Sequence, residues 1–445
     1  MKKKLLLGLA VIPALMLGGL TIKTNVTFAS PSVTFTNKSS VNDVRAYFIA
    51  ELDKVDLSIY REAQKVEVSN LINEVKTRLN NATTLNQLDA IYSSFSRYVL
   101  TIKTDAQLTE EENQPVIEEK VFRIANEDDL VEFQQDVNNG FTYQGYTVLL
   151  DEDITLTSHW TTGIGITTAN SFKGIFDGQN HTISNLYIRK STGCTALFGN
   201  AIDATIKNLK LSNVYIESTD STASTSQRTA GIVGRAERDT IENVHVLSGT
   251  IKGSQENGGI AGVAVNGITI KNCSNGAGVT GTGPRNAGIL GYLYSGTGYI
   301  ENCVNNGSVK CNGLGAGGIL ASNVDKTLVQ ISNCTNNGTV TNTSGGRTGG
   351  IVGILRVASS SPYTTKSTIT NCTNNADVTG SDVYSGAITG TNRGSVTDCS
   401  AKKGIKINNV VIENITGGND AEIERKQFFG AEDTGGTHSN CVLVD

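Results

Sequence analysis

Ile270-Lys271-Asn272-Cys273 is the stretch that decides the fold, because the chain repeats its pattern. The pattern Ile-x-Asn-Cys returns at residues 300–303, 331–334 and 369–372, and residues 396–399 are a divergent copy. Earlier copies without the cysteine lie at residues 183–186, 206–209 and 241–244. A second motif, Gly-Ile-x-Gly, alternates with the first at residues 231–234, 259–262, 288–291 and 350–353. Copies spaced by roughly 30 residues are typical of a solenoid.

Each repeat contains several runs of strand length, which one coil cannot bury alone but which stacked coils can share as a core. We expect the repeated isoleucines to form an inward ladder at the strand spacing of about 4.8 Å. Asparagine tolerates left-handed backbone angles, so the repeated asparagines should lie at bends and hydrogen-bond from coil to coil. The row is predicted to contain Asn208, Asn243, Asn272, Asn302, Asn333 and Asn371.

The composition suits short strands joined by tight turns. The chain has 445 residues, so two or more folding units are expected. It contains 48 glycines and only 5 prolines, which favours many turns over long helices. The net charge of -5 gives no sign of the basic patch of a nucleic-acid-binding domain. We therefore expect no nucleic-acid partner.

Residues 1–29 are predicted to be an export signal. A basic head at residues 2–4 precedes an apolar run at residues 5–20, and the small residues Thr27 and Ala29 suit cleavage after Ala29. The alternative is an uncleaved membrane anchor, which glycine and proline interruptions disfavour. No second apolar stretch reaches the ~18–20 residues of a span. We expect a secreted or cell-surface protein without a membrane span after signal removal, with cell-wall association as a further option.

A small helical module is predicted at residues 41–109, after a linker at residues 30–40. Apolar residues recur there at helical spacing, and Thr84 is the expected N-cap of the third of three helices. Residues 60–108 resemble small helical modules in secreted and surface proteins of Gram-positive bacteria, which implies a spacer or an attachment unit. An acidic linker at residues 110–120 is expected to separate this module from residues 121–445.

The second domain begins with a short amphipathic helix and continues as the repeats. Asn126 is its expected N-cap, and the helix is predicted to cap the first coil. Residues 172–186 (FKGIFDGQNHTISNL), with residues 197–199 and the Gly-Ile-x-Gly motifs, resemble the GLUG-motif proteins of bacterial surfaces. The resemblance covers about residues 122–400 and implies a right-handed parallel β-helix of the pectin-lyase-like kind. Ala321 departs from the pattern, because it replaces a closing glycine.

The 8 cysteines permit disulfides in an exported chain. Five of them share one repeat position: Cys273, Cys303, Cys334, Cys372 and Cys399. Stacked side chains point the same way, so their Cβ atoms stay farther apart than the ~3.8 Å of a disulfide. We therefore favour buried free thiols over disulfides. A zinc site is not predicted, because no close Cys-x-x-Cys or clustered histidine supports it.

No catalytic constellation emerges from the sequence. None of the histidines, at positions 159, 181, 245 and 438, recurs with a partner as a triad would require. Asp151, Glu152 and Asp153 form a carboxylate cluster, for which a solvated turn is favoured over a calcium site. We therefore predict no catalytic residue, no metal and no cofactor.

Aromatic residues are the candidates for binding. Trp160 is the only tryptophan, and Tyr292, Tyr294 and Tyr299 are predicted to cluster in one loop between coils. Rings on a rigid wall can stack on sugars or contact a protein partner, with local loop packing as the alternative. We favour a non-enzymatic binding or adhesion scaffold for an extracellular glycan or a surface protein. The alternatives are a polysaccharide lyase or glycoside hydrolase, and a structural spacer.

Overall fold

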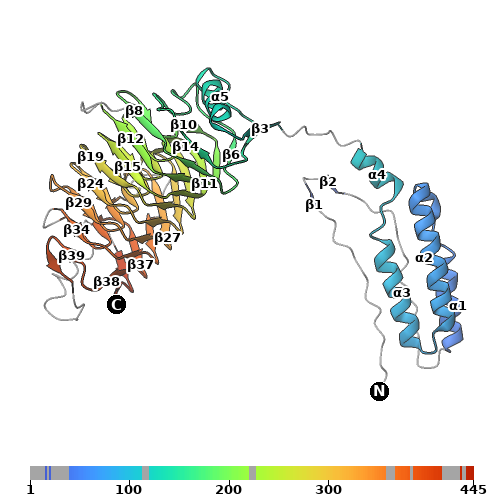
Figure 1. The fold of residues 1–445 in the computed structure, drawn as a ribbon. Helices are drawn as coiled ribbons and strands as arrows, with labels where there is room; N and C mark the ends of the chain where they lie inside the picture. Colours follow the sequence, from blue (N-terminus) through green and yellow to red (C-terminus); the bar gives the residue numbers. More distant parts are fainter. Residues whose placement is uncertain are drawn as a thin grey trace. The chain divides into compact units, whose positions relative to one another are not determined.

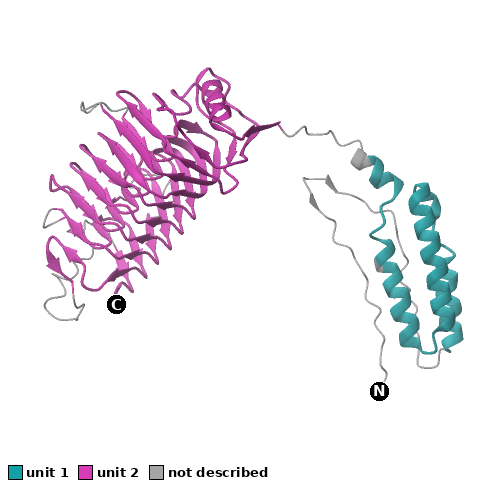
Figure 2. Cartoon of the chain, in the orientation of Figure 1, with its two compact units in different colours: residues 1–118 teal, residues 119–445 magenta. Residues whose placement is uncertain are grey.

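The computed structural model divides into two compact units, residues 1–118 and residues 119–445 (Figure 2). The described residues are 40–112, 120–219, 227–356, 366–380, 384–412, 431–432 and 437–445, with two short antiparallel strands, β1 (Met16–Leu17) and β2 (Leu20–Thr21). The predicted signal peptide and the linker at residues 30–40 otherwise lie outside the described residues, apart from Ser40. Within the described ranges, no helix combines the length and hydropathy that crossing a membrane requires.

The described part of the first unit contains four helices and a 3-10 turn, and residues of α1, η1, α2 and α3 share one apolar core. They are α1 (Val41–Leu52), the 3-10 turn η1 (Leu57–Ile59), α2 (Glu62–Asn81), α3 (Leu85–Val99) and α4 (Asp105–Glu112). Phe48 of α1 stacks on Tyr92 of α3 with ring centroids 4.4 Å apart. The Thr84 hydroxyl accepts the backbone N–H of Gln87, so the predicted N-cap of α3 is confirmed. Helix α4 was not predicted, and it extends to Glu112, into the residues assigned to the acidic linker.

The second unit is a mainly β, parallel solenoid in which strands of successive coils stack in register (Figure 1). This confirms the predicted parallel solenoid. Its strands form sheets of 25, 9 and 7 strands. The 9-stranded sheet contains β8 (Tyr187–Lys190), β12 (Val214–Ser218), β15 (Gly249–Gly253), β19 (Gly278–Gly281), β24 (Val309–Cys311), β29 (Val340–Asn342), β34 (Val378–Thr379), β39 (Lys406–Ile407) and β40 (Val410–Val411). The 7-stranded sheet contains β9 (Cys194–Thr195), β13 (Arg228–Ala230), β16 (Glu256–Gly258), β20 (Asn286–Ala287), β25 (Gly315–Gly317), β30 (Arg347–Gly349) and β35 (Ser385–Gly386).

The 25-stranded sheet bends around corners of the coils and carries both repeated motifs. The strands that follow the Gly-Ile-x-Gly turns, with their counterparts in the first and last coils, are β10 (Phe198–Ile202), β14 (Val233–Val246), β17 (Ala261–Lys271), β21 (Leu290–Leu293), β26 (Leu320–Asn323), β31 (Val352–Leu355), β36 (Thr389–Asn392) and β41 (Ala431–Glu432). The next face contains β3 (Lys120–Ile124), β4 (Tyr146–Leu150), β6 (Ile175–Asp177), β11 (Thr205–Ser212), β22 (Thr297–Glu301), β27 (Leu328–Ser332), β32 (Thr368–Thr370), β37 (Ser395–Thr397) and β42 (Thr437–Ser439). After the asparagine bend follow β5 (Ile154–Thr155), β7 (Thr182–Ser184), β18 (Ser274–Asn275), β23 (Val304–Asn305), β28 (Thr335–Asn336), β33 (Thr373–Asn374), β38 (Ser400–Lys402) and β43 (Val442–Val444).

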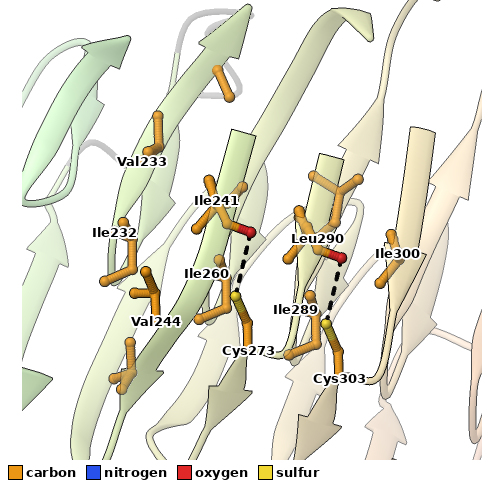
Figure 3. Packing of buried hydrophobic residues seen from close by; sticks show 14 of the residues in the cluster. Ile232, Val233, Ile241, Val244, Ile260, Cys273, Ile289, Leu290, Ile300 and Cys303 are labelled. Carbon is orange, nitrogen blue, oxygen red and sulfur yellow. Dashed lines mark hydrogen bonds between the residues drawn. The ribbon is translucent and has the colours of Figure 1, made fainter. Parts of the chain in front are cut away.

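The isoleucines of the two motifs form columns inside the solenoid. Ile241, Ile270 and Ile300 pair in register across adjacent coils and are fully buried. Ile232, Ile260 and Ile289 form a second column, and Figure 3 shows both columns pointing into the interior. Burying each such side chain contributes roughly 1.5–3 kcal/mol, and only a stacked neighbour completes the burial. The predicted isoleucine ladder is therefore confirmed.

The predicted asparagine row lies at the same bend of six successive coils. All six members, from Asn208 to Asn371, have left-handed backbone angles, with φ between 52° and 56°. Asn243 donates to the side-chain oxygen of Asn208 at 2.9 Å, and Asn302 donates to that of Asn272 at 3.1 Å. The row is confirmed, because the flanking strands keep the members in register.

A second asparagine row is buried inside the solenoid and was not predicted. Asn275, Asn305 and Asn336 are 0% exposed, and each donates to the next asparagine of the row at 2.8–2.9 Å, the last to Asn374. Each also bonds its own chain two residues on; the Asn305 amide, for example, bonds both backbone groups of Gly307. These bonds satisfy polar groups that would otherwise be costly to bury.

All eight cysteines are free thiols, and seven of them are buried. The repeat cysteines stack in a column, in which the backbone N–H groups of Cys303 and Cys334 point at the sulfur of the following cysteine at 3.4 Å. The thiol of Cys273 donates to the carbonyl of Ile241 at 3.6 Å, and Figure 3 shows this bond beside the isoleucine columns. The thiols thus pack as small apolar side chains stacked from coil to coil, as the sequence predicted.

Helix α5 (Glu127–Asn138) lies beside the first strands of the solenoid (Figure 1). The side chain of Asn126 accepts the backbone N–H of Asp129 at 3.0 Å, which confirms the predicted N-cap. Phe133 of α5 is fully buried and meets Tyr143 and Phe172 edge to face, with ring centroids 4.9 and 5.5 Å apart. The helix therefore buries its apolar face on the first coils.

Candidate functional site

Arginine and tyrosine side chains gather beside the Gly-Ile-x-Gly turns. Arg228, Glu256 and Arg285 occupy one register position in three successive coils, because β13, β16 and β20 pair in parallel. Arg347 and Tyr384 continue this position farther along the solenoid. Coils stack at about 4.8 Å, so these side chains form a strip across the strands. Two further register columns lie on the strands after the turns, and we name the three columns together the Arg–Tyr strip. Its charged and aromatic members are Arg228, Arg235, Glu237, Glu256, Arg285, Tyr292, Tyr294, Arg347, Arg356, Tyr384 and Arg393.

Glu256 is the buried carboxylate of the strip. It accepts from the guanidinium of Arg285 at 3.1 Å, and the Arg228 Nε lies 3.4 Å from its second oxygen. The residue is only 7% exposed, and its burial raises the pKa of the carboxyl although both arginines oppose the shift. A buried charge needs such partners to offset its desolvation. Glu256 therefore fixes two guanidinium groups in place.

Tyrosine rings hold the arginines from the other side. The Arg285 guanidinium carbon lies 3.9 Å from the ring centroid of Tyr292, which is cation–π geometry. Tyr292 meets Tyr294 edge to face at 6.1 Å, and Tyr294 is 59% exposed. Farther along, Arg347 lies 4.7 Å from the ring centroid of Tyr384. The strip thus combines fixed cations with accessible rings.

Two further arginines of the strip are paired with carboxylates. Arg235 contacts Glu237 at 2.7 Å, and Arg356 contacts both oxygens of Asp325 at 3.1 and 3.2 Å. Arg235 Nη1 and Arg285 Nε are buried and have no hydrogen-bond partner among the described residues. Burying guanidinium donors without a partner is costly.

The structure separates the aromatic residues that the sequence grouped. Trp160 is only 5% exposed and belongs to the core of the first coils, where it packs locally instead of standing on the surface. Tyr292 and Tyr294 do come together, but Tyr292 lies on β21 and Tyr299 on β22, so the predicted common loop was wrong. Tyr299 is 44% exposed and lies in register with Thr269 and Gln330, outside the columns of the strip.

The arginines of the strip were missed, although the sequence carries a signal for them. Arg228, Arg285 and Arg347 each lie three residues before the first glycine of a Gly-Ile-x-Gly motif. A residue at a fixed distance from a repeated turn recurs on the same face of every coil. The spacing therefore could have placed three arginines in one line.

The carboxylate cluster near residue 151 is used in local contacts. Arg123 binds Asp151 at 2.8 Å and lowers the pKa of that carboxyl, and Asp153 accepts the backbone N–H of Thr182 at 2.7 Å. His181 lies 3.2 Å from the same Asp153 oxygen. In the part of the chain that the structure describes, no three histidine, cysteine, aspartate or glutamate side chains gather in a metal-binding arrangement.

No family model and no curated protein matches the sequence. Among solved structures, the chain is similar to a protein from Bacteroides ovatus described as a candidate immunoglobulin A1 protease. The two are 20% identical, with a TM-score of 0.45, over 72% of this chain and 83% of that chain.

Proposed function

We propose that this chain is a non-enzymatic binding or adhesion scaffold that uses the Arg–Tyr strip to hold an extracellular glycan or a surface protein. The observation that carries the proposal is the fixation of Arg285 between Glu256 and the ring of Tyr292. A side chain that is already ordered loses little conformational entropy when a ligand binds. Stacked coils supply the extended rigid surface that solenoids use for binding.

A glycan array with two matched tyrosine variants tests this proposal. Tyr294 and Tyr299 are both exposed, at 59% and 44%, but only Tyr294 belongs to the strip. We expect Tyr294→Ala to weaken binding roughly threefold to tenfold, because an exposed ring offers a stacking surface. Tyr299→Ala should bind like the parent chain. Absence of binding to every glycan and to cell surfaces would contradict the proposal.

A polysaccharide-active lyase or glycoside hydrolase is the second candidate, and Glu256 is the observation that favours it. Burial raises the pKa of this carboxyl, and it lies between two arginines, as a proton-transfer group in an active site often does. Incubation with polyanionic polysaccharides and detection of new reducing ends tests this candidate. Turnover that Glu256→Gln abolishes would replace the binding proposal with an enzymatic one.

We further propose that the solenoid is a right-handed β-helix of the GLUG-motif type and that α5 caps its first coil. The capping role is supported by the burial of Leu130, Phe133 and Val137 against the first coils. Phe133→Ala should destabilise the unit by about 3–5 kcal/mol and promote concentration-dependent association, because it loosens the cover of an open sheet edge. Light scattering measures the association, and a variant that stays monomeric would contradict the capping role.

Export and attachment are proposed from the sequence and from the helices of the first unit. The chain is expected to be cleaved after Ala29 and to be secreted or held at the cell surface. The packed helices α1, α2 and α3 are proposed to form the three-helix spacer or attachment module. N-terminal sequencing of the exported protein checks the cleavage, and fractionation of cells that produce a chain lacking residues 41–109 checks the attachment.

A further inference from the structure

The arginines of the solenoid are concentrated on one strip. The described solenoid contains nine arginines, at positions 123, 189, 228, 235, 238, 285, 347, 356 and 393. Six of them belong to the Arg–Tyr strip, and the three register columns of the strip contain no lysine. Arginine presents a planar fork of donors that fits carboxylate and sulfate groups, whereas lysine presents a point charge. The residue type therefore indicates recognition of a planar or polyoxygen anion.

The strip carries an excess of positive charge on a chain whose net charge is -5. Among the described residues, five of the six guanidinium groups lie within 4.0 Å of three carboxylates, those of Glu237, Glu256 and Asp325, and the sixth, that of Arg347, lies over the ring of Tyr384. Glu256 is shared by two arginines, and Asp325 lies near both Arg356 and Arg393. The strip therefore holds more guanidinium groups than the carboxylates that contact them, and its positive charge attracts an external anion.

The positive groups recur along the solenoid. Arg228, Arg285 and Arg347 share one register position and occupy every second coil, since Glu256 and Gly315 stand between them. With coils stacked at about 4.8 Å, these guanidinium groups recur at roughly 10 Å intervals. A ligand that matches such a row carries its own charges at regular intervals.

We infer that the ligand of the Arg–Tyr strip is a linear polysaccharide with regularly spaced carboxylate or sulfate groups, bound along the solenoid axis. The inference rests on the binding function proposed above and names its ligand class. The arginines would contact the anionic groups, and the rings of Tyr294 and Tyr384 would pack against sugar rings.

An acidic polypeptide is the less favoured ligand. A peptide binds to a β structure most readily by adding a strand to a free sheet edge. The strip instead crosses paired strands, whose backbone groups already bond to neighbouring coils. Recognition on this face therefore depends on side chains, and exposed tyrosine rings suit sugars.

Binding of soluble polymers to the full chain tests the inference. The probes are alginate for uronates, chondroitin sulfate for sulfates, dextran as a neutral glycan, and poly-glutamate as an acidic polypeptide, at low and at physiological ionic strength. The test variant combines Arg347→Gln with Arg356→Gln, and the matched control is Arg189→Gln, whose arginine is paired with Glu217 on the 9-stranded sheet. Circular dichroism checks that each variant is folded.

We expect alginate or chondroitin sulfate to bind, dextran not to bind, and the double variant to bind at least about tenfold more weakly. Arg189→Gln should bind like the parent. If poly-glutamate binds as tightly as the polysaccharides, the ligand is not specifically a polysaccharide and the inferred ligand class is overturned. If dextran binds as tightly as the charged polymers, or if the double variant binds like the parent, the role of charge is overturned while the proposed binding function stays intact. Binding of no probe here and no glycan on the array would overturn both proposals.

Discussion

The backbone of Gly288 packs directly against the side-chain amide of Asn305. A Cβ atom on Gly288 would lie 2.1 Å from the Asn305 amide carbon and 2.3 Å from the carbonyl oxygen of Gly318. The same contact recurs in other coils between Gly259 and Asn275, Gly318 and Asn336, and Gly350 and Asn374. In these four coils the first glycine of the Gly-Ile-x-Gly turn therefore makes room for the buried asparagine that lies two residues after the cysteine of the Ile-x-Asn-Cys motif.

Replacement of Gly288 should be costly for this reason. Gly288→Ala is expected to lower the free energy of unfolding by about 2–3 kcal/mol, because the added methyl group overlaps a buried amide and a backbone carbonyl that cannot both move away. The matched control is Gly278→Ala, where the nearest atom to an added Cβ is the Ser308 hydroxyl at 3.5 Å. Urea unfolding followed by circular dichroism measures both variants. Equal stability of the two would contradict the packing argument.

The buried asparagine row should contribute more to the free energy of unfolding than the exposed asparagines that directly follow it in the chain. Asn305 makes hydrogen bonds to Asn275, Asn336 and both backbone groups of Gly307, so Asn305→Ala leaves several buried polar groups without a partner. We expect a loss of about 2–4 kcal/mol. Asn306 is exposed and accepts one bond from Asn337 at 2.8 Å, so Asn306→Ala should cost less than about 1 kcal/mol. A smaller effect at Asn305 than at Asn306 would refute this assignment.

The sequence predicts the periodic part of this structure well and the binding strip poorly, for one physical reason. Ile270 and Asn272 recur because every coil imposes the same burial and the same bend on them. Asn275 also recurs, but an asparagine next to a bend suggests a solvated turn, and only the partner Asn305 of the next coil makes its burial favourable. Arg285 directly precedes β20 and Tyr292 lies seven positions later on β21, so their contact depends on the turn between them.

The thiol column predicts a specific pattern of chemical reactivity. Hydrogen bonding to the neighbouring Cys273 thiol, together with burial, raises the pKa of Cys303, and a thiol that stays protonated is a poor nucleophile. Only Cys441 is partly exposed. Hydrogen bonding to Cys399 also raises the pKa of Cys441, so access to the reagent is what distinguishes this thiol. We expect Cys441 of the native protein to react with a disulfide reagent in a phase that is rapid relative to the buried thiols, and all eight to react after unfolding without reductant. Cys441→Ser should remove the rapid phase, and two or fewer reactive thiols in the unfolded chain would show that disulfides form.

Glu127 should make the attachment of α5 sensitive to acid. Although its partial burial acts to raise the pKa, the hydroxyls and backbone N–H groups of Ser158 and Thr157 lower the pKa of Glu127 to about 2, against an ordinary value of 4.5. A depressed pKa means that the folded state favours the charged carboxylate. Its contribution to stability is therefore complete above about pH 4.5 and is lost as the pH falls toward 2.

Replacement of this carboxylate tests the linkage between α5 and the first coils. Glu127→Gln should be less stable than the parent at neutral pH, and the difference should shrink at about pH 3, because the unfolded parent is protonated at Glu127 there while the folded parent still holds the carboxylate. Urea unfolding at the two pH values measures this change. Glu132→Gln is the matched control, since Glu132 is an exposed carboxylate on the same helix. A difference between parent and Glu127→Gln that stays constant with pH would mean that the four hydrogen bonds do not depend on the charge of Glu127.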